Sequence, residues 1–359
     1  MEASRFGGAQ AVVLRAIADG VTPAAAVEVG GSDGPLWREA FGTILDRDGS
    51  PADTPPDAIF DLASLTKVIA TTSLAMGLVE AGSLSLRDRV ARWIPTWRGL
   101  DREDVVVGDL LAHASGLTAF LPFYRDHEGR VEFEPAITGL ALEYAPRTRS
   151  VYSDLGFMLL GWIVADAGGR TLDDQFAALC HRLAVDDLRF RPPPAWRVRT
   201  APTGVDPWRA RLLVGEVHDQ NAWALGGIAG HAGLFGSARA VGAFARHVLR
   251  GLRGLGTPLA SADTLHAFTR RTTVPGSSRA LGWDTMLPTS SCGRRLSATA
   301  IGHTGFTGTS LWIDWEADTY IVLLTNRVHH STDSHAILDV RPAFHDAVMD
   351  ALHPPSDHA

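Results

Sequence analysis

Ser64 and Lys67 have the types and the spacing to act together in a reaction. They lie three residues apart at the start of a helix predicted over residues 68–80, so both side chains project from one helix face. A serine hydroxyl becomes a strong nucleophile when a neighbouring base removes its proton, and lysine can be this base if burial or nearby positive charge lowers its pKa. The NH groups at a helix N-terminus would stabilise negative charge beside the serine. The apolar turns that follow predict a buried helix, which favours a functional lysine over a solvated one.

A second candidate group is Tyr152-Ser153-Asp154, which stands before an apolar stretch over residues 155–167. A phenol beside an ammonium group can share the movement of protons between a nucleophile and a leaving group. Tyr152 therefore becomes a candidate for proton transfer. Asp154 has a purely structural alternative, because aspartate is a common N-cap of a following helix.

A third candidate group is His303-Thr304-Gly305, followed by Phe306, between two predicted strands. Glycine and threonine are common in plain β-turns, which is the structural interpretation of this segment. In the functional interpretation, the main-chain NH of Phe306 and that of Ser64 bind the carbonyl oxygen of a substrate. Donors in such an oxyanion hole typically contribute about 3 kcal/mol each.

The remaining pattern predicts the elements that must position these groups. Helical spacing of apolar residues occurs near the N-terminus and through the middle of the chain, at residues 6–17, 105–112, 155–167, 172–183 and 238–252. Strand patterns cover residues 24–29, 36–41, 281–286, 298–303, 309–315 and 320–326, and a last helix covers 340–352. Residues 222–236 are so rich in glycine that a loop is predicted. Strands at both ends with helices between them indicate an α/β domain interrupted by a helical insertion.

The three groups resemble, in order and context, the signature elements of serine β-lactamases and penicillin-binding proteins. Residues 110–117 resemble the family's segment beside the active site, and residues 226–235 its glycine-rich loop, so the resemblance spans nearly the whole chain. It implies an α/β (α+β) fold of the DD-peptidase/β-lactamase type, with an antiparallel sheet flanked by helices (residues 1–85 and 275–359), a mainly helical domain (86–274) and the active site in the cleft between them. It also implies that Ser64 is acylated, that Lys67 and Tyr152 exchange protons, and that Ser64 and Phe306 supply the oxyanion hole.

Two departures from the family pattern bear on the substrate. His303 stands where lysine is usual, and a mostly neutral histidine holds a substrate carboxylate less firmly. Asp154 stands where asparagine is usual, which adds negative charge and removes an amide donor. The predicted substrate-binding residues are Asp154, His303, Thr304, Gly305 and Phe306.

Residues 215–222 and 302–310 resemble a subgroup that includes amidases of cell-wall muropeptides. The leading hypothesis is a cytoplasmic muropeptide amidase or D-peptidase-like enzyme that acts on a peptidoglycan fragment or another small molecule. A carboxylesterase or a weak β-lactamase uses the same acyl-enzyme chemistry and stays as an alternative.

Composition limits the partners. The net charge of −7 argues against nucleic acid, which needs a basic surface. No stretch reaches the roughly 20 apolar residues that a membrane span requires, and charges interrupt the first twenty residues, so a cytoplasmic location is expected if Met1 is the native start. Cys180 and Cys292 lie far apart, without the spacing of a thiolate zinc site. No cofactor is predicted.

Two other classes of protein fit part of the sequence. A metallohydrolase could use the histidines, but none of them shows the spacing of a zinc-binding pair; the candidates were His113, His218, His231, His303, His329 and His330. His231, between glycines, could line the cleft or hydrogen-bond to stabilise its loop. A non-catalytic sensor of peptidoglycan fragments is the other class, and the intact Ser64, Lys67 and Tyr152 argue against it.

Overall fold

A seven-stranded antiparallel sheet is the largest sheet of the molecule, in a computed structural model that describes residues 5–46 and 48–354. The strand order is β3-β2-β1-β12-β11-β10-β9. The N-terminal segment supplies β1 (Ala24–Gly31), β2 (Gly34–Leu45) and β3 (Pro51–Asp53). The C-terminal segment supplies β9 (Asp284–Thr285), β10 (Ile301–Thr304), β11 (Ser310–Asp314) and β12 (Thr319–Thr325). β1 pairs with β12, for example Ala26 with Leu324, so the two ends of the chain close one sheet.

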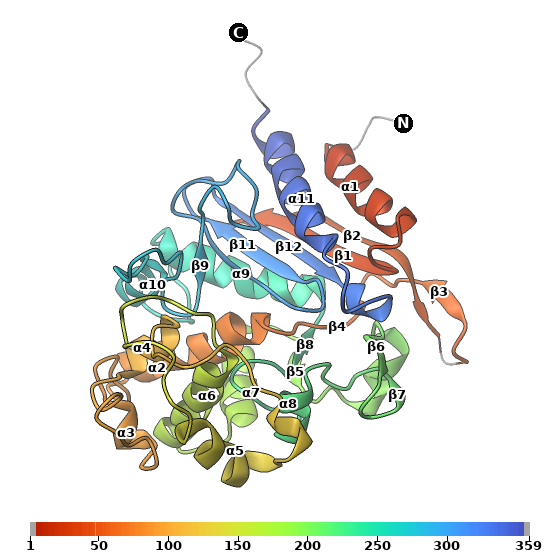
Figure 1. Ribbon diagram of the computed structural model, residues 1–359. Coiled ribbons are helices and arrows are strands. Elements are labelled where there is room, and N and C mark those ends of the chain that lie inside the picture. The colour runs from red at the N-terminus through yellow and green to blue at the C-terminus, as the bar shows by residue number, and fades with distance from the viewer. Residues whose placement is uncertain (1–4, 47, 355–359) are drawn as a thin grey trace.

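Helices cover both faces of this sheet. α1 (Gly7–Ala18) and α11 (Ile337–Leu352) lie side by side on one face, and α9 (Ala238–Leu252) packs on the other (Figure 1). Successive residues of a strand point to opposite faces, so Val27 of β1 joins the core under α1 and α11, whereas Ala26 joins the core under α9. This alternation explains why β1 and β12 are apolar on both faces.

The middle of the chain is mainly helical. Next to the sheet lie the π-helix η1 (Lys67–Thr72) and α2 (Ser73–Glu80), which continue one another. The other helices are α3 (Val90–Trp93), α4 (Val107–Leu111), α5 (Gly129–Thr138), α6 (Asp154–Gly168), α7 (Leu172–Leu183), α8 (Gln220–Ala224) and α10 (Ala262–Thr269). α6 is buried over most of its surface and contacts η1, α2, α4 and α7, so it forms the centre of this part.

Short strands and turns connect these helices. β4 (Phe60–Asp61), β8 (Leu234–Gly236) and β5 (Leu188–Phe190) form a three-stranded sheet, and β6 (Gly204–Asp206) pairs with β7 (Arg211–Leu213). The 3₁₀ turns are η2 (Phe123–Arg125), η3 (Pro194–Arg199) and η4 (Arg327–His329).

The predicted α/β fold with an antiparallel sheet is confirmed, and several details differ, of which two concern the domain description. Residues 222–236, predicted as a loop, include the end of α8 and all of β8, because the Gly236 segment pairs with both β4 and β5. The range 86–274, predicted as the helical domain, includes α9, whose contacts are with the sheet. The domain limits themselves stay a prediction.

Candidate active site

Ser64 lies in a tight turn between β4 and the buried helix that begins with η1. The residue before it, Ala63, has a φ of 46°, a left-handed conformation that is unfavourable for alanine. The turn ends in the π-helix that carries Lys67, so both side chains face the same point, as their spacing predicted. Ser64 is partly exposed, while Lys67 is fully buried.

The ammonium group of Lys67 uses all three of its donors. It lies 3.0 Å from Ser64 Oγ, 2.7 Å from Asp154 Oδ1 and 3.0 Å from the main-chain oxygen of His231. Burial lowers the pKa of Lys67, but the charge of Asp154 and the nearby Tyr152 outweigh burial, so the pKa is raised. The condition under which lysine can be the base, a lowered pKa, is therefore not met at rest, and the sequence does not reveal that the Asp154 carboxylate contacts the amine.

Tyr152 also contacts Ser64. Its hydroxyl donates to Ser64 Oγ over 2.7 Å, and its ring centroid lies 4.8 Å from Lys67 Nζ. Burial raises the pKa of Tyr152, although the charge of Lys67 opposes this, so the phenol is neutral at rest. Ser64 Oγ thus accepts hydrogen bonds from two groups that can exchange protons.

Helix α6 places Tyr152 and Asp154. Ser153, not Asp154, is the N-cap: its hydroxyl accepts from Gly156 N over 3.2 Å and donates to Thr118 O over 2.6 Å. Asp154 is instead the first helical residue, and its carboxylate is paired with Lys67. Its predicted role in substrate binding stays a prediction.

His303 stands on β10 beside Tyr152, with ring centroids 5.8 Å apart. Its Nδ1 lies 2.8 Å from the carbonyl oxygen of Thr304, and a carbonyl only accepts, so Nδ1 carries the proton. Burial, followed by the charges of Arg279 and Lys67, lowers the pKa of His303 well below its usual value. The ring is neutral, and its Nε2 is a buried acceptor with no partner among the described residues.

Gly305 and Phe306 bring the turn between β10 and β11 against the nucleophile turn. A Cβ on Gly305 would lie 2.7 Å from Leu62 O and 2.2 Å from Thr309 Oγ1, so only glycine permits this approach. Within residues 5–46 and 48–354, the main-chain NH groups of Ser64 and Phe306 have no hydrogen-bond partner. These are the two donors predicted for an oxyanion hole.

Three neighbouring residues complete the surroundings of the site. His113 accepts from Ser153 N at Nδ1 over 3.0 Å, and its ring centroid lies 4.7 Å from that of Tyr152, so it supports the phenol. The sequence indicates His113 only as part of residues 110–117 and as a candidate metal ligand, without this contact. His231 is buried, and its Nε2 lies 3.0 Å from Asp219 Oδ1, which agrees with the loop-stabilising alternative. The Arg279 guanidinium lies 5.2 Å from the centroid of the Tyr152 ring, and no sequence motif predicts this residue as part of the site.

The sequence shows no spacing for a thiolate zinc site at the two cysteines. Cys180 and Cys292 are buried free thiols, and burial raises the pKa of each to about 12. In the described part of the chain, no three His, Cys, Asp or Glu side chains gather closely enough to hold a metal ion.

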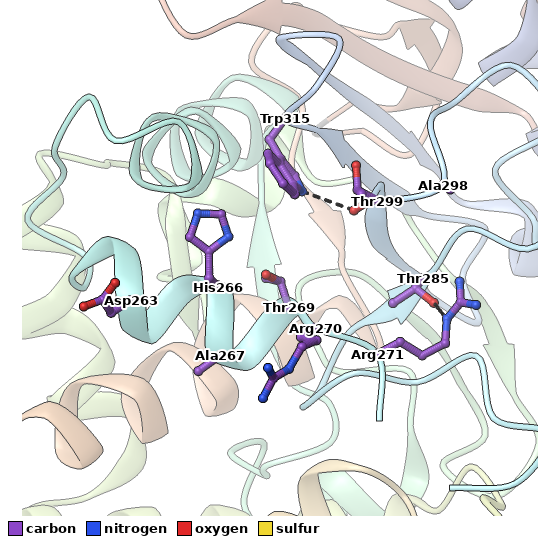
Figure 2. A pocket seen from close by; sticks show the side chains of 10 residues that line it. All are labelled: Asp263, His266, Ala267, Thr269, Arg270, Arg271, Thr285, Ala298, Thr299 and Trp315. Carbon is purple, nitrogen blue, oxygen red and sulfur yellow. Dashed lines mark hydrogen bonds between the residues drawn. The ribbon is translucent and has the colours of Figure 1, made fainter. Parts of the chain in front are cut away.

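A separate cavity of about 580 Å³ lies between α10 and the ends of β9 and β11 (Figure 2). In this cavity Trp315 donates to Thr299 O over 3.2 Å, and Arg271 donates to Thr285 Oγ1 over 2.7 Å. The lining residues are Asp263, His266, Ala267, Thr269, Arg270, Arg271, Thr285, Ala298, Thr299 and Trp315. They differ from the residues around Ser64, so the cavity is not the candidate active site.

Comparison with known proteins decides the family. The model of the family described as "Beta-lactamase" matches residues 10–341. The chain belongs to the β-lactamase family. This β-lactamase-family protein is a serine hydrolase, in agreement with the resemblance of its three motifs.

Two curated relatives of this β-lactamase-family protein carry the same name. A protein of Escherichia coli (strain K12) named "Putative D-alanyl-D-alanine carboxypeptidase" is 30% identical over 334 residues, which cover 82% of this chain and 76% of that relative. A protein of the same name from Salmonella gallinarum is 30% identical over 333 residues, with the same coverage.

Solved structures share the fold. The hydrolase EstCE1, described as having promiscuous acyltransferase activity, is 21% identical, with a TM-score of 0.74 over 95% of this chain and 98% of that one. A class C β-lactamase from Rhodobacter sphaeroides is 20% identical, with a TM-score of 0.73 over 96% of this chain and 99% of that one.

None of the helices in residues 5–46 and 48–354 combines the length and apolar character that crossing a membrane needs.

Proposed function

We propose that this serine hydrolase cleaves an amide bond in a small peptide that carries a free carboxylate, by way of an acyl-enzyme on Ser64. This is a D-peptidase-like activity, and muropeptide fragments are the leading candidates for the substrate. The observation that carries the proposal is that Ser64 Oγ accepts hydrogen bonds from both Lys67 and Tyr152. The name of the 30% identical relatives supports the substrate class.

The first half of the reaction acylates Ser64. Lys67, in the fraction that has lost a proton from its ammonium group, accepts the proton of Ser64 while Oγ forms a bond to the substrate carbonyl carbon. The NH groups of Ser64 and Phe306 stabilise the negative oxygen. The C–N bond then breaks, the leaving amine takes the proton of the Tyr152 hydroxyl, and Lys67 returns a proton to Tyr152.

The second half reverses the roles. A water oxygen forms a bond to the acyl carbon and its proton passes to Lys67. The bond from Ser64 Oγ to the acyl carbon then breaks, and a proton from Lys67 restores the serine hydroxyl. The product is a carboxylic acid, and the groups return to their initial state.

Arg279 supports a substrate with a carboxylate. His303 replaces the family's usual lysine and is neutral, so it gives no positive charge to an anion. Arg279 lies beside the Tyr152 ring and acts on the charge state of His303, and its side chain is 20% exposed. A guanidinium can bind a carboxylate with two parallel hydrogen bonds, so Arg279 supplies the charge that the His303 position lacks.

A panel of substrates tests the proposal. We expect hydrolysis of an N-acyl-D-alanyl-D-alanine peptide and of muramyl peptides to exceed that of the same peptides with an amidated C-terminus, and Ser64→Ala to abolish both. Circular dichroism of Ser64→Ala verifies that the fold is intact. Efficient turnover of p-nitrophenyl acetate or nitrocefin without peptide hydrolysis would instead support the esterase or β-lactamase alternative. Unchanged turnover by Ser64→Ala would place the nucleophile elsewhere.

A further inference from the structure

Asp61 is a buried carboxylate that the mechanism above does not use. It is the last residue of β4, three residues before Ser64, and only 2% of its surface is exposed. Both of its oxygens accept main-chain hydrogen bonds. Oδ1 accepts from Ala63 N over 2.8 Å, and Oδ2 accepts from His218 N over 2.6 Å.

The first of these bonds holds the nucleophile turn. Ala63 has a φ of 46°, which alanine does not favour, so its conformation depends on contacts that hold it in place. The bond from Ala63 N to Asp61 is such a contact. Since Ala63 directly precedes Ser64, this bond sets the direction of the Ser64 NH.

Asp61 also touches the segment that carries the second oxyanion donor. Its main-chain oxygen accepts from Thr307 Oγ1 over 2.8 Å, one residue after Phe306. The bond from its Oδ2 holds His218, whose ring centroid lies 5.9 Å from that of Phe306. One residue therefore connects the surroundings of both NH donors.

We propose that Asp61 is a positioning residue whose ionised carboxylate keeps the Ser64 and Phe306 NH groups aimed at the same substrate oxygen. This inference rests on the acyl-enzyme mechanism proposed above. A protonated carboxyl group has only one good acceptor oxygen, because the other oxygen now carries a proton. It cannot accept from both Ala63 N and His218 N, so acid loosens the arrangement.

The groups around Asp61 place this change in an accessible pH range. Burial raises the pKa of Asp61 to about 6, the two main-chain bonds lower it in part, Asp219 raises it, and Arg209 lowers it. Arg209 is itself paired with Asp206 at 2.9 Å. The His218 ring is kept neutral by burial, which lowers its pKa, and Arg327 lies over the Phe306 ring.

The sign of the linkage separates this effect from acid unfolding. The folded pKa of Asp61 is raised from 3.8 to about 6, so the folded state binds more protons than the unfolded state between these values. Its contribution to stability therefore increases as pH falls through this window. A loss of activity on acidification that Asp61 causes is not a loss of fold.

The test compares the protein with Asp61→Asn across pH 5 to 8, using kcat for p-nitrophenyl acetate and the rate of Ser64 labelling by a fluorophosphonate. An amide offers one acceptor oxygen and one donor group, so the Asp61→Asn side chain imitates the protonated acid. For each readout, the rate of the unmodified protein is divided by the rate of Asp61→Asn. This ratio removes contributions common to both proteins, including that of Lys67. We expect a ratio of about ten at pH 8, as misplaced catalytic groups give, falling to about two at pH 5, where about a tenth of Asp61 is still ionised, with a midpoint near pH 6.

Two further variants keep the test decisive. Asp314 is also fully buried and accepts from Ser297 N over 2.6 Å, but it lies on β11 outside the site, so Asp314→Asn should give a ratio that does not change with pH. Thr307→Val removes the bond to the main chain of Asp61; we expect a lower kcat with the midpoint near pH 6 retained. It replaces Asp61→Asn if that variant does not fold.

A ratio for Asp61→Asn that stays constant from pH 5 to 8, or that equals one throughout, would overturn the inference. For Thr307→Val, an unchanged kcat would do the same. Absence of labelling in the unmodified protein at every pH would count against the acyl-enzyme proposal itself, so the two failures are distinguishable.

Discussion

The Lys67–Asp154 pair decides how much free base is present at a given pH. The carboxylate holds a proton on the amine, against the effect of burial. The charged pair stabilises the fold fully below pH 10.5, the ordinary pKa of lysine, and this contribution disappears as pH rises through the raised folded pKa. Activity that needs the neutral amine should therefore increase with pH.

Asp154→Asn should move the ascending limb of the pH profile of kcat/KM to lower pH, by about one unit or more. The amide keeps an acceptor oxygen for Lys67 but removes the charge, so burial then dominates and lowers the lysine pKa. Rates of ester hydrolysis from pH 5 to 10 measure the shift. A limb that stays in place or moves to higher pH would contradict this account of the pair.

The same variant should be less stable at neutral pH. Removal of one partner from a buried ion pair typically costs about 3–5 kcal/mol, and the loss is smaller where Lys67 can release its proton. Thermal unfolding at pH 7 and at pH 9 checks this, because the loss should be smaller at the higher pH.

Arg279→Gln should reduce kcat/KM for a peptide with a free C-terminal carboxylate by about tenfold to a hundredfold, the effect of a lost charged hydrogen bond of about 1.5–3 kcal/mol. The amidated peptide should be affected little. Arg271→Gln is the matched control, because Arg271 comes from the same part of the chain but bonds to Thr285 and Met286. Equal losses on both peptides would remove Arg279 from carboxylate recognition.

At the scale of elements, we expect the N-terminus of α6 to contribute both to the stability of the fold and to the activity. The Ser153 hydroxyl caps the helix and also donates to Thr118 O. Ser153 lies between Tyr152, which contacts Ser64, and Asp154, which contacts Lys67. We expect Ser153→Ala to cost about 1 kcal/mol of stability, as the loss of an N-cap does, and to lower kcat as well, because Tyr152 loses a fixed neighbour.

Ser237→Ala gives the matched control for this prediction. Ser237 caps α9 by accepting from Ala240 N over 3.2 Å, the same distance as in the Ser153 cap, but α9 carries none of the site residues. Chemical denaturation and kcat for one ester are measured for both variants. A similar loss of stability with kcat reduced only in Ser153→Ala is expected, and equal kcat values would show that the cap acts on stability alone.

The elements predicted best from the sequence are those whose pattern is long. The predicted limits of α7 and α9 agree with the structure, because each helix has a regular apolar face over 12 or 15 residues. β4, β5 and β8 have two or three residues each and form only because distant segments pair, so no local pattern reveals them. The same distinction holds for the candidate site. Local motifs predict Ser64, Lys67 and Tyr152 as candidates, whereas Arg279 and Asp61 are recognised only from their contacts in the folded chain.

At the scale of the whole molecule, α9 packs on the sheet directly over a buried polar cluster. Glu28 of β1 accepts from Tyr320 of β12 over 2.9 Å and pairs with Arg38 of β2. Glu28 is almost fully buried beneath α9, where a glycine, Gly242, faces it. The helix can lie this close to the sheet only because that position has no side chain.

Gly242→Ala should therefore destabilise the protein, although alanine favours helices more than glycine does. A Cβ at this position would lie 2.0 Å from Glu28 Oε1, and the partners of Glu28 on two strands prevent it from moving aside. Overpacking of this kind typically costs about 1–3 kcal/mol. In Gly77→Ala, by contrast, the new Cβ meets no atom within 4 Å in α2, so a gain of about 0.5–1 kcal/mol is expected. Urea denaturation of both variants measures the two free energies of unfolding. If Gly242→Ala were more stable than the unmodified protein, α9 would be able to shift on the sheet. The buried Glu28 cluster would then not determine the position of the helix.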